Sequence, residues 1–198
     1  MATAEEPDDR VPHPGPHHHC EDATALQRAG AWALNVIVIV AWIGFVSGLR
    51  LFAFGDASPP TADIGAKLVG HGLGLLTLTL PVLLYFSLSE WRWGYSLGKA
   101  ALGLRVVDKT GHYPTFGRAL LRNVILLAPW EMAHSAIWWS PGRPFLDPPG
   151  DVAKGVLVAA TAMALAWFVS TLIWPGRSIH DRLSGTKVVQ VGVLKPVD

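Results

Sequence analysis

The stretch YSLGKAALGLRVVDKTGHYPTFGRALLRN, residues 95–123, decides how this chain is arranged. It is a long polar segment with regularly placed glycines, and it lies between runs of apolar residues. Six of the sixteen lysines and arginines fall between Arg92 and Arg122. Because cytoplasmic loops of membrane proteins carry an excess of Lys and Arg, the stretch is predicted to be cytoplasmic.

The composition around this stretch is that of a membrane protein. Hydrophobic residues make up 51% of the chain, charged residues only 16%, and there are nine tryptophans in 198 residues. The net charge of +1 gives a nucleic-acid partner no electrostatic support. A single cysteine, Cys20, excludes an intrachain disulfide. No nucleotide-binding or hydrolase motif is present, so we expect neither an enzyme nor a cofactor.

Four segments have the length and apolar character of membrane-spanning helices. The expected helices run over about residues 29–50, 68–90, 118–139 and 152–174, and a cytoplasmic loop, residues 91–117, joins the second to the third. The third segment spans only if Arg118 and Arg122 extend toward the cytoplasm along their aliphatic stems. A helix lying on the membrane surface is the alternative for this segment.

Twelve of the sixteen basic residues fall on the cytoplasmic side if both termini are inside. Residues 1–25 are rich in His and Pro and are expected to form a disordered cytoplasmic tail. Its histidines and Cys20 offer metal ligands, but a solvated tail is the favoured interpretation, and no metal site is predicted. The membrane domain is expected to cover residues 26–192, and a short tail, residues 193–198, follows it.

The cytoplasmic loop is predicted to contain a small β-structure. Residues 104–116 are interpreted as a β-hairpin, because Asp108-Lys109-Thr110-Gly111 offers a turn with glycine where a positive φ is needed. The β-prone run 187–191 is predicted to add a third strand. The predicted fold class is therefore an all-α membrane protein with four transmembrane helices, a small cytoplasmic β-hairpin and a C-terminal strand.

Three local features add detail to this topology. Residues 96–102 are predicted to form a short interfacial helix that directs Lys99 to lipid phosphate, so anionic lipid is an expected partner at the cytoplasmic face. Pro81 is expected to kink the second helix. Gly70 and Gly74 form a small-xxx-small pair, a weak signal for close helix packing.

The segments SLGKAALGLRVVDKTGHYPTFGRALLRN and RSIHDRLSGTKVV resemble the conserved motifs of the RDD family of small bacterial membrane proteins. With the first apolar segment, the resemblance covers about residues 26–192. It implies a multi-pass protein of the bacterial plasma membrane. The positions that carry it are Arg28, Asn35 and Asp181, and in the cytoplasmic motifs Gly98, Lys99, Gly103, Arg105, Arg122, Gly185 and Thr186.

The family is named after one arginine and two aspartates, which the resemblance places at Arg28, at Asn35 and at Asp181. Asn35 departs from the pattern, since an amide does not titrate near neutral pH. Transport, including cation–proton antiport, has been proposed for family members, and a role that requires a titrating carboxylate in the first helix does not fit this chain. Arg28 and Asp181 are expected to pair, either as a structural latch or as a gate.

Three ionisable residues fall within the outer half of the expected membrane region. Glu131 and His134 lie three residues apart on one helix face, and His71 lies at a similar depth on the preceding helix. We expect the three to meet as a proton or cation site. The alternative is that the histidines are interfacial and Glu131 is a neutral structural acid.

Two functions follow from these features. The first is a small membrane protein that transports ions or a small ligand, and a homodimer is favoured because four helices barely enclose a path. The second is a non-transporting membrane module that binds lipid or a partner protein through its basic cytoplasmic face. The charged residues at membrane depth favour the first function, and Asn35 favours the second.

Overall fold

A computed structural model describes residues 21–55, 62–174 and 176–191. The long helices are α1 (Ala25–Phe54), α5 (Phe116–Trp138), α6 (Asp151–Ile173) and a continuous rod made of α2 (Ile64–Gly74), the π-helical turn η1 (Leu75–Thr79) and α3 (Leu80–Trp93). The short elements are α4 (Leu97–Ala101), α7 (Ile179–Ser184), β1 (Glu21–Asp22), β2 (Leu104–Asp108) and β3 (Thr186–Gln190).

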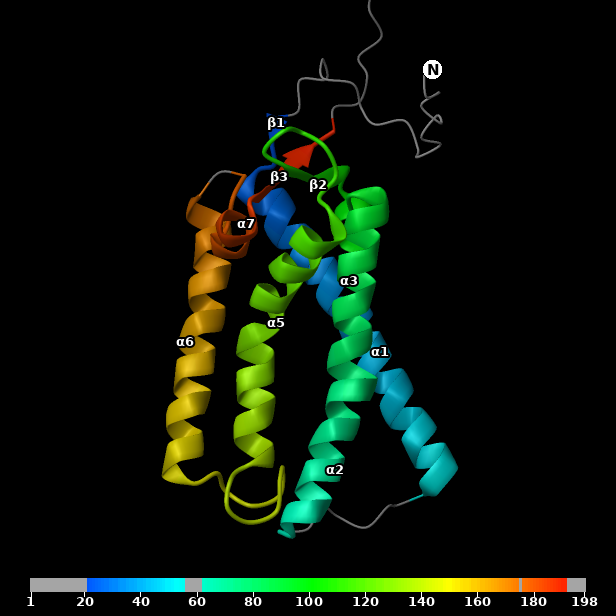
Figure 1. The fold of residues 1–198 in the computed structure, drawn as a ribbon, viewed down its shortest axis with the longest axis vertical. Helices are drawn as coiled ribbons and strands as arrows, with labels where there is room; N and C mark the ends of the chain where they lie inside the picture. The colour runs from blue at the N-terminus through cyan, green and yellow to red at the C-terminus, as the bar shows by residue number, and fades with distance from the viewer. Residues whose placement is uncertain (1–20, 56–61, 175, 192–198) are drawn as a thin grey trace, which may run out of the picture.

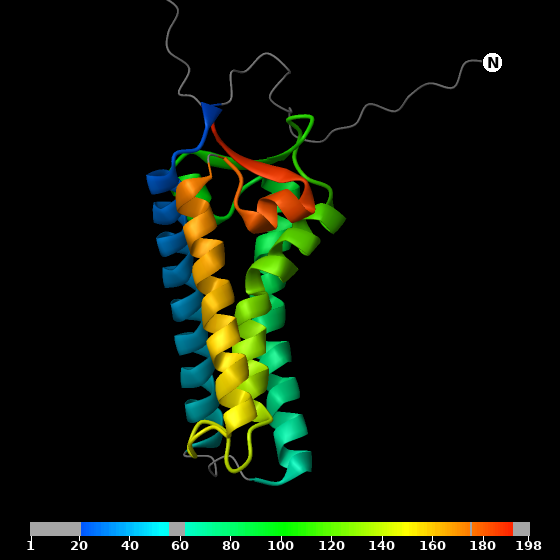
Figure 2. The ribbon, with the colours of Figure 1, turned by 90° about the vertical axis from the view of Figure 1, so that its left-hand side faces the viewer.

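The four long rods form a bundle with a small sheet at one end (Figures 1 and 2). We call the end that carries β1, β2 and β3 the sheet end, and the opposite one the far end. The α5 helix lies lengthwise between the α2–α3 rod and α6, and α1 crosses behind the bundle at an angle and diverges from it toward the far end (Figure 1). This arrangement leaves α1 and α6 as neighbours near the sheet end.

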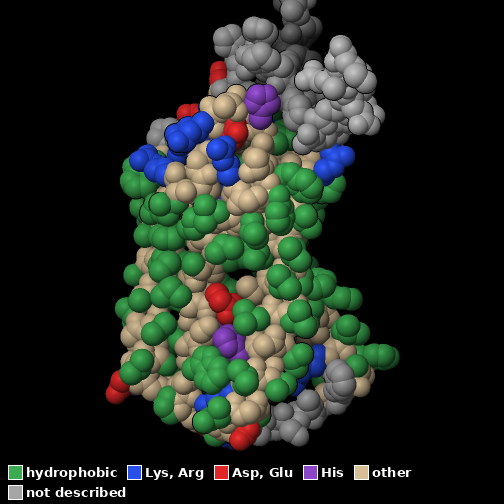
Figure 3. All heavy atoms as spheres, viewed as in Figure 1, with side chains coloured by type: hydrophobic (Ala, Val, Ile, Leu, Met, Phe, Trp, Pro, Cys, Tyr) green, Lys and Arg blue, Asp and Glu red, His purple; other side chains and the backbone are tan. Residues whose placement is uncertain are grey.

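Three helices of the described part of the chain are long and apolar enough to cross a membrane: Ala25–Ala53, Ile64–Trp93 and Asp151–Ile173. The α5 helix, which contains Arg118, Arg122 and Glu131, is not among them. Side chains on the face shown in Figure 3 are mainly hydrophobic along the rods, and Lys and Arg gather near the sheet end. The structure therefore shows a mostly helical protein with three candidate spans.

The sheet differs from the predicted hairpin. The pairing of β2 with β3 is confirmed, antiparallel, with Leu104 opposite Gln190 and Asp108 opposite Thr186. The turn is also confirmed, with Gly111 at φ 89°. No second strand follows it, however, because Pro114 has no N–H to donate and Thr115 already caps α5.

The third strand comes instead from the N-terminal segment, which gives the sheet order β1-β3-β2. Glu21 pairs with Gln190, and the side chain of Ala23 is buried beneath the sheet. Thr24 then starts α1 through a capping box with Gln27. The predicted disordered tail is thus wrong for residues 21–25, and residues 1–20 lie outside the described part.

Pro81 removes a helical hydrogen bond, and the structure shows how the freed group is satisfied. The carbonyl four residues earlier belongs to Thr77, and it accepts the indole N–H of Trp42 at 3.0 Å. The π-helical turn η1 ends at Thr79, two residues before Pro81, and the Thr77 hydroxyl donates to the Leu73 carbonyl at 2.7 Å. Trp42 thereby joins α1 to the α2–α3 rod inside the apolar layer.

Candidate functional site

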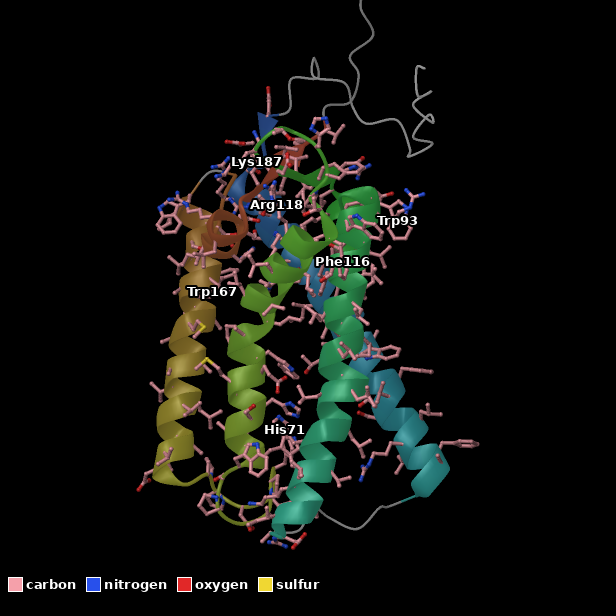
Figure 4. The ribbon with its side chains drawn as sticks, viewed as in Figure 1. His71, Trp93, Phe116, Arg118, Trp167 and Lys187 are labelled. Atoms are coloured by element: carbon pink, nitrogen blue, oxygen red, sulfur yellow. The ribbon has the colours of Figure 1, made fainter. Side chains whose placement is uncertain are left out.

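The structure brings His71, Glu131 and His134 together near the far end. His71 Nε2 lies 3.2 Å from Glu131 Oε1, and His134 Nδ1 lies 3.4 Å from the same oxygen. The two imidazole rings meet edge to face at 5.2 Å. His71 projects from α2 toward α5 (Figure 4). The expected meeting of these three side chains is therefore what the structure shows.

Two glycines on α2 make room for this cluster. A Cβ on Gly70 would lie 2.2 Å from the Trp138 ring, and a Cβ on Gly74 would lie 2.7 Å from the His134 ring. Because any larger residue would collide with these rings, the small-xxx-small pair serves the packing of α5 aromatics against α2. The pair thus sets the separation at which His71 reaches Glu131.

Two tryptophan indoles determine which ring nitrogen of each histidine carries the proton. Trp139 Nε1 donates to His71 Nδ1 at 3.1 Å, and Trp138 Nε1 donates to His134 Nε2 at 2.8 Å. An indole nitrogen is only a donor, so each accepting ring nitrogen carries a lone pair and no proton. These contacts therefore favour, for each ring, the tautomer that carries its N–H on the nitrogen nearest Glu131.

The Glu131 carboxylate faces hydrogen-bond donors on both oxygens. Oε1 accepts from His71 Nε2, and Oε2 accepts the Thr79 hydroxyl at 2.8 Å. The Nδ1 of His134 is close but poorly aligned, and it is a buried nitrogen without a hydrogen-bond partner. The indole N–H groups occupy the outer nitrogen of each ring, so the inner nitrogen of each ring is the one that faces Glu131. Glu131 is thus the acidic group at the centre of this cluster.

The same three side chains have the composition of a metal site, since their ligand atoms lie within 4.8 Å of one another. A metal on the nitrogens that face Glu131 would move each ring proton to the outer nitrogen. That proton would then oppose the indole N–H of Trp138 or Trp139. The indole donors therefore disfavour a metal ion on the ring nitrogens that face Glu131.

Glu131 is reached from a groove of about 800 Å³ between α3, α5 and α6. The groove is lined mainly by apolar side chains, and Glu131, Thr79 and Ser135 are its polar groups near the cluster. The Glu131 side chain retains 27% of its exposure, whereas that of His134 is nearly buried. Figure 3 shows the hollow between the rods, with acidic and histidine side chains beside it.

A second polar cluster is buried at the sheet end. Glu90 on α3 accepts from Lys99 Nζ at 2.9 Å, from Arg122 Nη1 at 2.8 Å and from Asn123 Nδ2 at 3.0 Å. Arg122 also donates through Nε to Asp181 Oδ1 at 2.8 Å. Two carboxylates and two cations thus balance one another and tie α3, α4, α5 and α7 together.

The predicted contact of Lys99 with lipid phosphate is wrong. Residues 97–101 do form the expected short helix, but the ammonium of Lys99 points inward to Glu90 and is buried. Burial lowers the pKa of Lys99, against the attraction of Glu90, which raises it. Lys99 therefore stabilises the packing of α4 rather than a membrane contact.

The predicted pairing of Arg28 with Asp181 is also wrong. Asp181 is held by Arg122 and by Ser178, whose N–H donates at 3.0 Å. Burial alone would raise the pKa of Asp181, but the charge of Arg122 outweighs it, and the pKa lies well below its usual range. Arg28 donates instead to the Trp174 carbonyl at 2.7 Å. The side chain of Arg28 thus joins α1 to the end of α6 through the Trp174 carbonyl and not through a carboxylate.

Asn35 has a structural role that uses both ends of its amide. Its Nδ2 donates to Ser96 Oγ at 3.0 Å, and its Oδ1 accepts the N–H of Gly98 at 3.0 Å. A Cβ on Gly98 would lie 2.2 Å from the Ala31 carbonyl, so only glycine permits this approach of α4 to α1. Asn35 therefore docks α4 and does not titrate.

The remaining motif positions shape the chain near the sheet. Gly103 and Gly185 have φ of 66° and 70°, and Gly185 ends α7. Thr186 donates to Asp181 at 3.3 Å. The guanidinium of Arg105 stacks 3.8 Å from the centre of the Tyr95 ring. These four positions support the fold and lie outside the His71–Glu131–His134 cluster.

The sequence interpretation missed several partners. Glu90 is not among the predicted site residues, although a lone acid next to a strongly basic loop is a signal for a buried counter-charge. Tryptophans at the end of an apolar segment are typical of a membrane interface, whereas the indoles of Trp138 and Trp139 donate to His134 and His71. The partners of Glu90 include residues distant in sequence, and the contact of Trp138 with His134 depends on the side-chain rotamers. Neither is encoded in a local sequence pattern.

The comparison with known families agrees with this architecture. The family model described as "RDD family" matches residues 23–185, most of the chain. The search of curated proteins and the search of solved structures found no match. The matched region includes the three apolar helices, the cluster around Glu131 and the motifs at the sheet end. The chain therefore belongs to the RDD family and is a multi-pass membrane protein.

Proposed function

We propose that this protein carries protons across the membrane, with Glu131 as the proton-binding group. The observation that supports it most is the Glu131 carboxylate, which lies among apolar rods and faces two histidines whose tautomers are set by Trp138 and Trp139. Ionisable groups at membrane depth are costly and mark ion or proton pathways. In this proposal the ion transport expected from the sequence is proton transport.

The proposed topology has four spans, with α5 as the fourth and the sheet end in the cytoplasm of a bacterial cell. The lengthwise position of α5 in the bundle supports spanning (Figure 1). Its charges do not oppose it, because Arg122 is neutralised inside the protein and Arg118 pairs with Asp108 at the sheet end. The distribution of basic residues along the sequence supports the orientation.

Thr79 is the proposed link between the two sides of the bundle. It binds Glu131 and lines both the far-end groove and a second cavity that extends toward the sheet end. In this proposal a proton enters from the groove, resides on Glu131 and leaves past the Thr79 hydroxyl. The mechanism involves no bond chemistry on a substrate, so the protein is proposed as a carrier and not as an enzyme.

Proton flux in proteoliposomes that contain the purified full-length protein tests this function. An imposed pH gradient should dissipate faster with the protein than in empty vesicles, and Glu131→Gln should remove the increment. Asp151→Asn is the matched control, because Asp151 lies at the same end but is exposed and bonded to Lys154. Equal flux with Glu131→Gln and the unmodified protein would contradict the proposal.

The buried network weakens the case for the alternative, a non-transporting module with a basic lipid-binding face. Lys99 and Arg122 are engaged with Glu90, and Arg105 stacks on Tyr95, so these cations are already engaged within the protein. Unchanged flux in the experiment above would favour this alternative. The homodimer expected from the sequence stays a prediction.

A further inference from the structure

Arg28 is buried, and one of the two terminal nitrogens of its guanidinium group lacks a hydrogen-bond partner in the described part of the chain. Its Nη1 donates to the Trp174 carbonyl, but its Nη2 is buried and has no hydrogen-bond partner within residues 21–55, 62–174 and 176–191. The residue as a whole is 6% exposed. Because a buried charge is costly unless an opposite charge or several hydrogen bonds compensate it, this guanidinium lacks an anion.

The charges around Arg28 do not supply that anion. Asp181 is already bonded to Arg122, and Glu90 is shared by Arg122 and Lys99. The other nearby carboxylate belongs to Asp22, which is half-exposed and lies 4.0 Å from Lys187. The buried network is neutral by itself, and Arg28 adds one uncompensated positive charge.

Arg28 lines a cavity of about 550 Å³ that lies between α1, α3, α5 and α6. Along α1 the lining runs from Arg28 to Ile43, and along α6 from Ala160 to Thr171. The fifteen helical steps from Arg28 to Ile43 cover about 22 Å along α1. One leaflet of the hydrocarbon core is about 15 Å thick. The cavity is therefore long enough for a polar headgroup at Arg28 and one acyl chain beyond it.

The walls of this cavity are open to the surrounding membrane. Trp32 and Val40 line it on α1 while being 50% and 60% exposed, and Phe168 lines it on α6 at 39%. The ring of Trp32 lies 5.7 Å from that of Phe168. An apolar wall with a lateral opening suits a hydrocarbon chain, and it does not suit a small soluble anion.

We propose that this cavity binds an anionic phospholipid, with its phosphate on Nη2 of Arg28 and one acyl chain along α1. The phosphate supplies the missing negative charge and accepts the unpaired N–H groups. The acyl chain fills the apolar part between α1 and α6. The cavity shares Thr79 and Leu127 with the groove that holds Glu131, so a bound lipid lies beside the exit proposed for the proton. The binding of the lipid is nevertheless measured without proton transfer by Glu131.

Native mass spectrometry of the full-length protein in detergent tests the proposal. The protein is stripped of lipid and titrated with dioleoyl phosphatidylglycerol, with dioleoyl phosphatidylcholine or with glycerol 3-phosphate. A charge-assisted hydrogen bond predicts about tenfold tighter binding of the anionic lipid than of the zwitterionic one. Glycerol 3-phosphate should show no measurable binding, because it has no acyl chain.

Three variants test the headgroup contact and the acyl-chain contact separately. Arg28→Gln should remove the preference for phosphatidylglycerol, whereas Arg28→Lys should retain part of it. Ile39→Trp narrows the cavity without a charge change and should weaken both lipids. Arg50→Gln, an exposed arginine at the other end of α1, is the matched control and should behave like the unmodified protein.

Three outcomes would overturn the inference. The first is an unchanged lipid preference in Arg28→Gln, the second is undiminished lipid binding in Ile39→Trp, and the third is binding of glycerol 3-phosphate as tight as that of the lipid. Comparable melting temperatures of the variants establish that a loss of binding is not a loss of folding. The proton-flux assay is independent of these readouts, so failure of one proposal is distinguishable from failure of the other.

Discussion

Trp167 donates its indole N–H to the backbone carbonyl of Ile125 at 2.9 Å, and that carbonyl is the one freed by Pro129 four residues later. Trp167 lies on α6, in the part nearer the sheet end (Figure 4), and its indole reaches the backbone of α5. The contact repeats the relationship of Trp42 to the carbonyl freed by Pro81. In both places a tryptophan satisfies a backbone group that has no water to bind.

Trp167→Phe should destabilise the protein, because it leaves the Ile125 carbonyl unpaired in an apolar environment. The expected cost is about 1–3 kcal/mol, measured as a lowered melting temperature in detergent. In a Pro129→Ala background the helix regains its own donor, so the same substitution should cost less. An equal cost in both backgrounds would show that the indole acts only through packing.

Gly98→Ala should detach α4 from α1, because the added Cβ meets the Ala31 carbonyl and the Asn35 amide. We expect a loss of about 1–3 kcal/mol in the free energy of unfolding. Gly117→Ala is the control, since a Cβ there has nothing within 4 Å. Equal melting temperatures of the two variants would rule out the close approach of Gly98.

Arg122→Gln should be strongly destabilising, because it leaves Glu90 and Asp181 without their shared cation. Removal of one partner of a buried ion pair costs about 3–5 kcal/mol. Arg118→Gln removes a half-exposed cation bonded only to Asp108 and should cost less than about 1 kcal/mol. Thermal unfolding of both variants measures the difference, and similar values would argue against the network.

Stability should fall as the pH drops from about 6.5 toward 4. Burial lowers the pKa of His180 to about 4, so between these values the unfolded chain binds a proton that the folded protein does not. The stabilisation is therefore complete above the unfolded pKa and is lost with acidification. His180→Asn should flatten the dependence of melting temperature on pH over this range, and an unchanged slope would assign it to another group.

Trp138→Phe combined with Trp139→Phe should turn the Glu131 cluster into a metal site. Without the indole donors each imidazole is free to carry its proton on the outer nitrogen and to offer a lone pair toward Glu131. We expect Co²⁺ binding, seen by visible absorption, in the double variant and not in the unmodified protein. Adding His134→Asn should abolish it. Metal binding by the unmodified protein would contradict the assigned tautomers.

Much of the architecture was predictable because it rests on local patterns. The apolar segments became α1, the α2–α3 rod, α5 and α6, and residues 104–107 pair with the C-terminal strand as expected. Glu131 and His134 share a helix face by spacing, and equal depth placed His71 beside them. The predicted hairpin was wrong because Pro114 and the cap of α5 prevent a strand directly after the turn.

Partner choice was not predictable in the same way. Asp181 had several candidate cations, and the structure selects Arg122 rather than Arg28. Lys99 was equally able to face lipid or Glu90, and the position of α4 against α1 decided it. Such contacts depend on the crossing of helices, which a residue pattern within one segment does not encode.

The sequence by itself determined that this is a membrane protein, where its apolar helices run and which end carries the basic residues. These properties follow from hydropathy, helix spacing and charge, each of which acts within one segment. Only the tertiary structure decided that Trp138 and Trp139 fix the state of the histidines around Glu131, and that Arg28 is left without an anion. The reason is geometric, because hydrogen-bond partners are chosen by distance and alignment after the helices have packed.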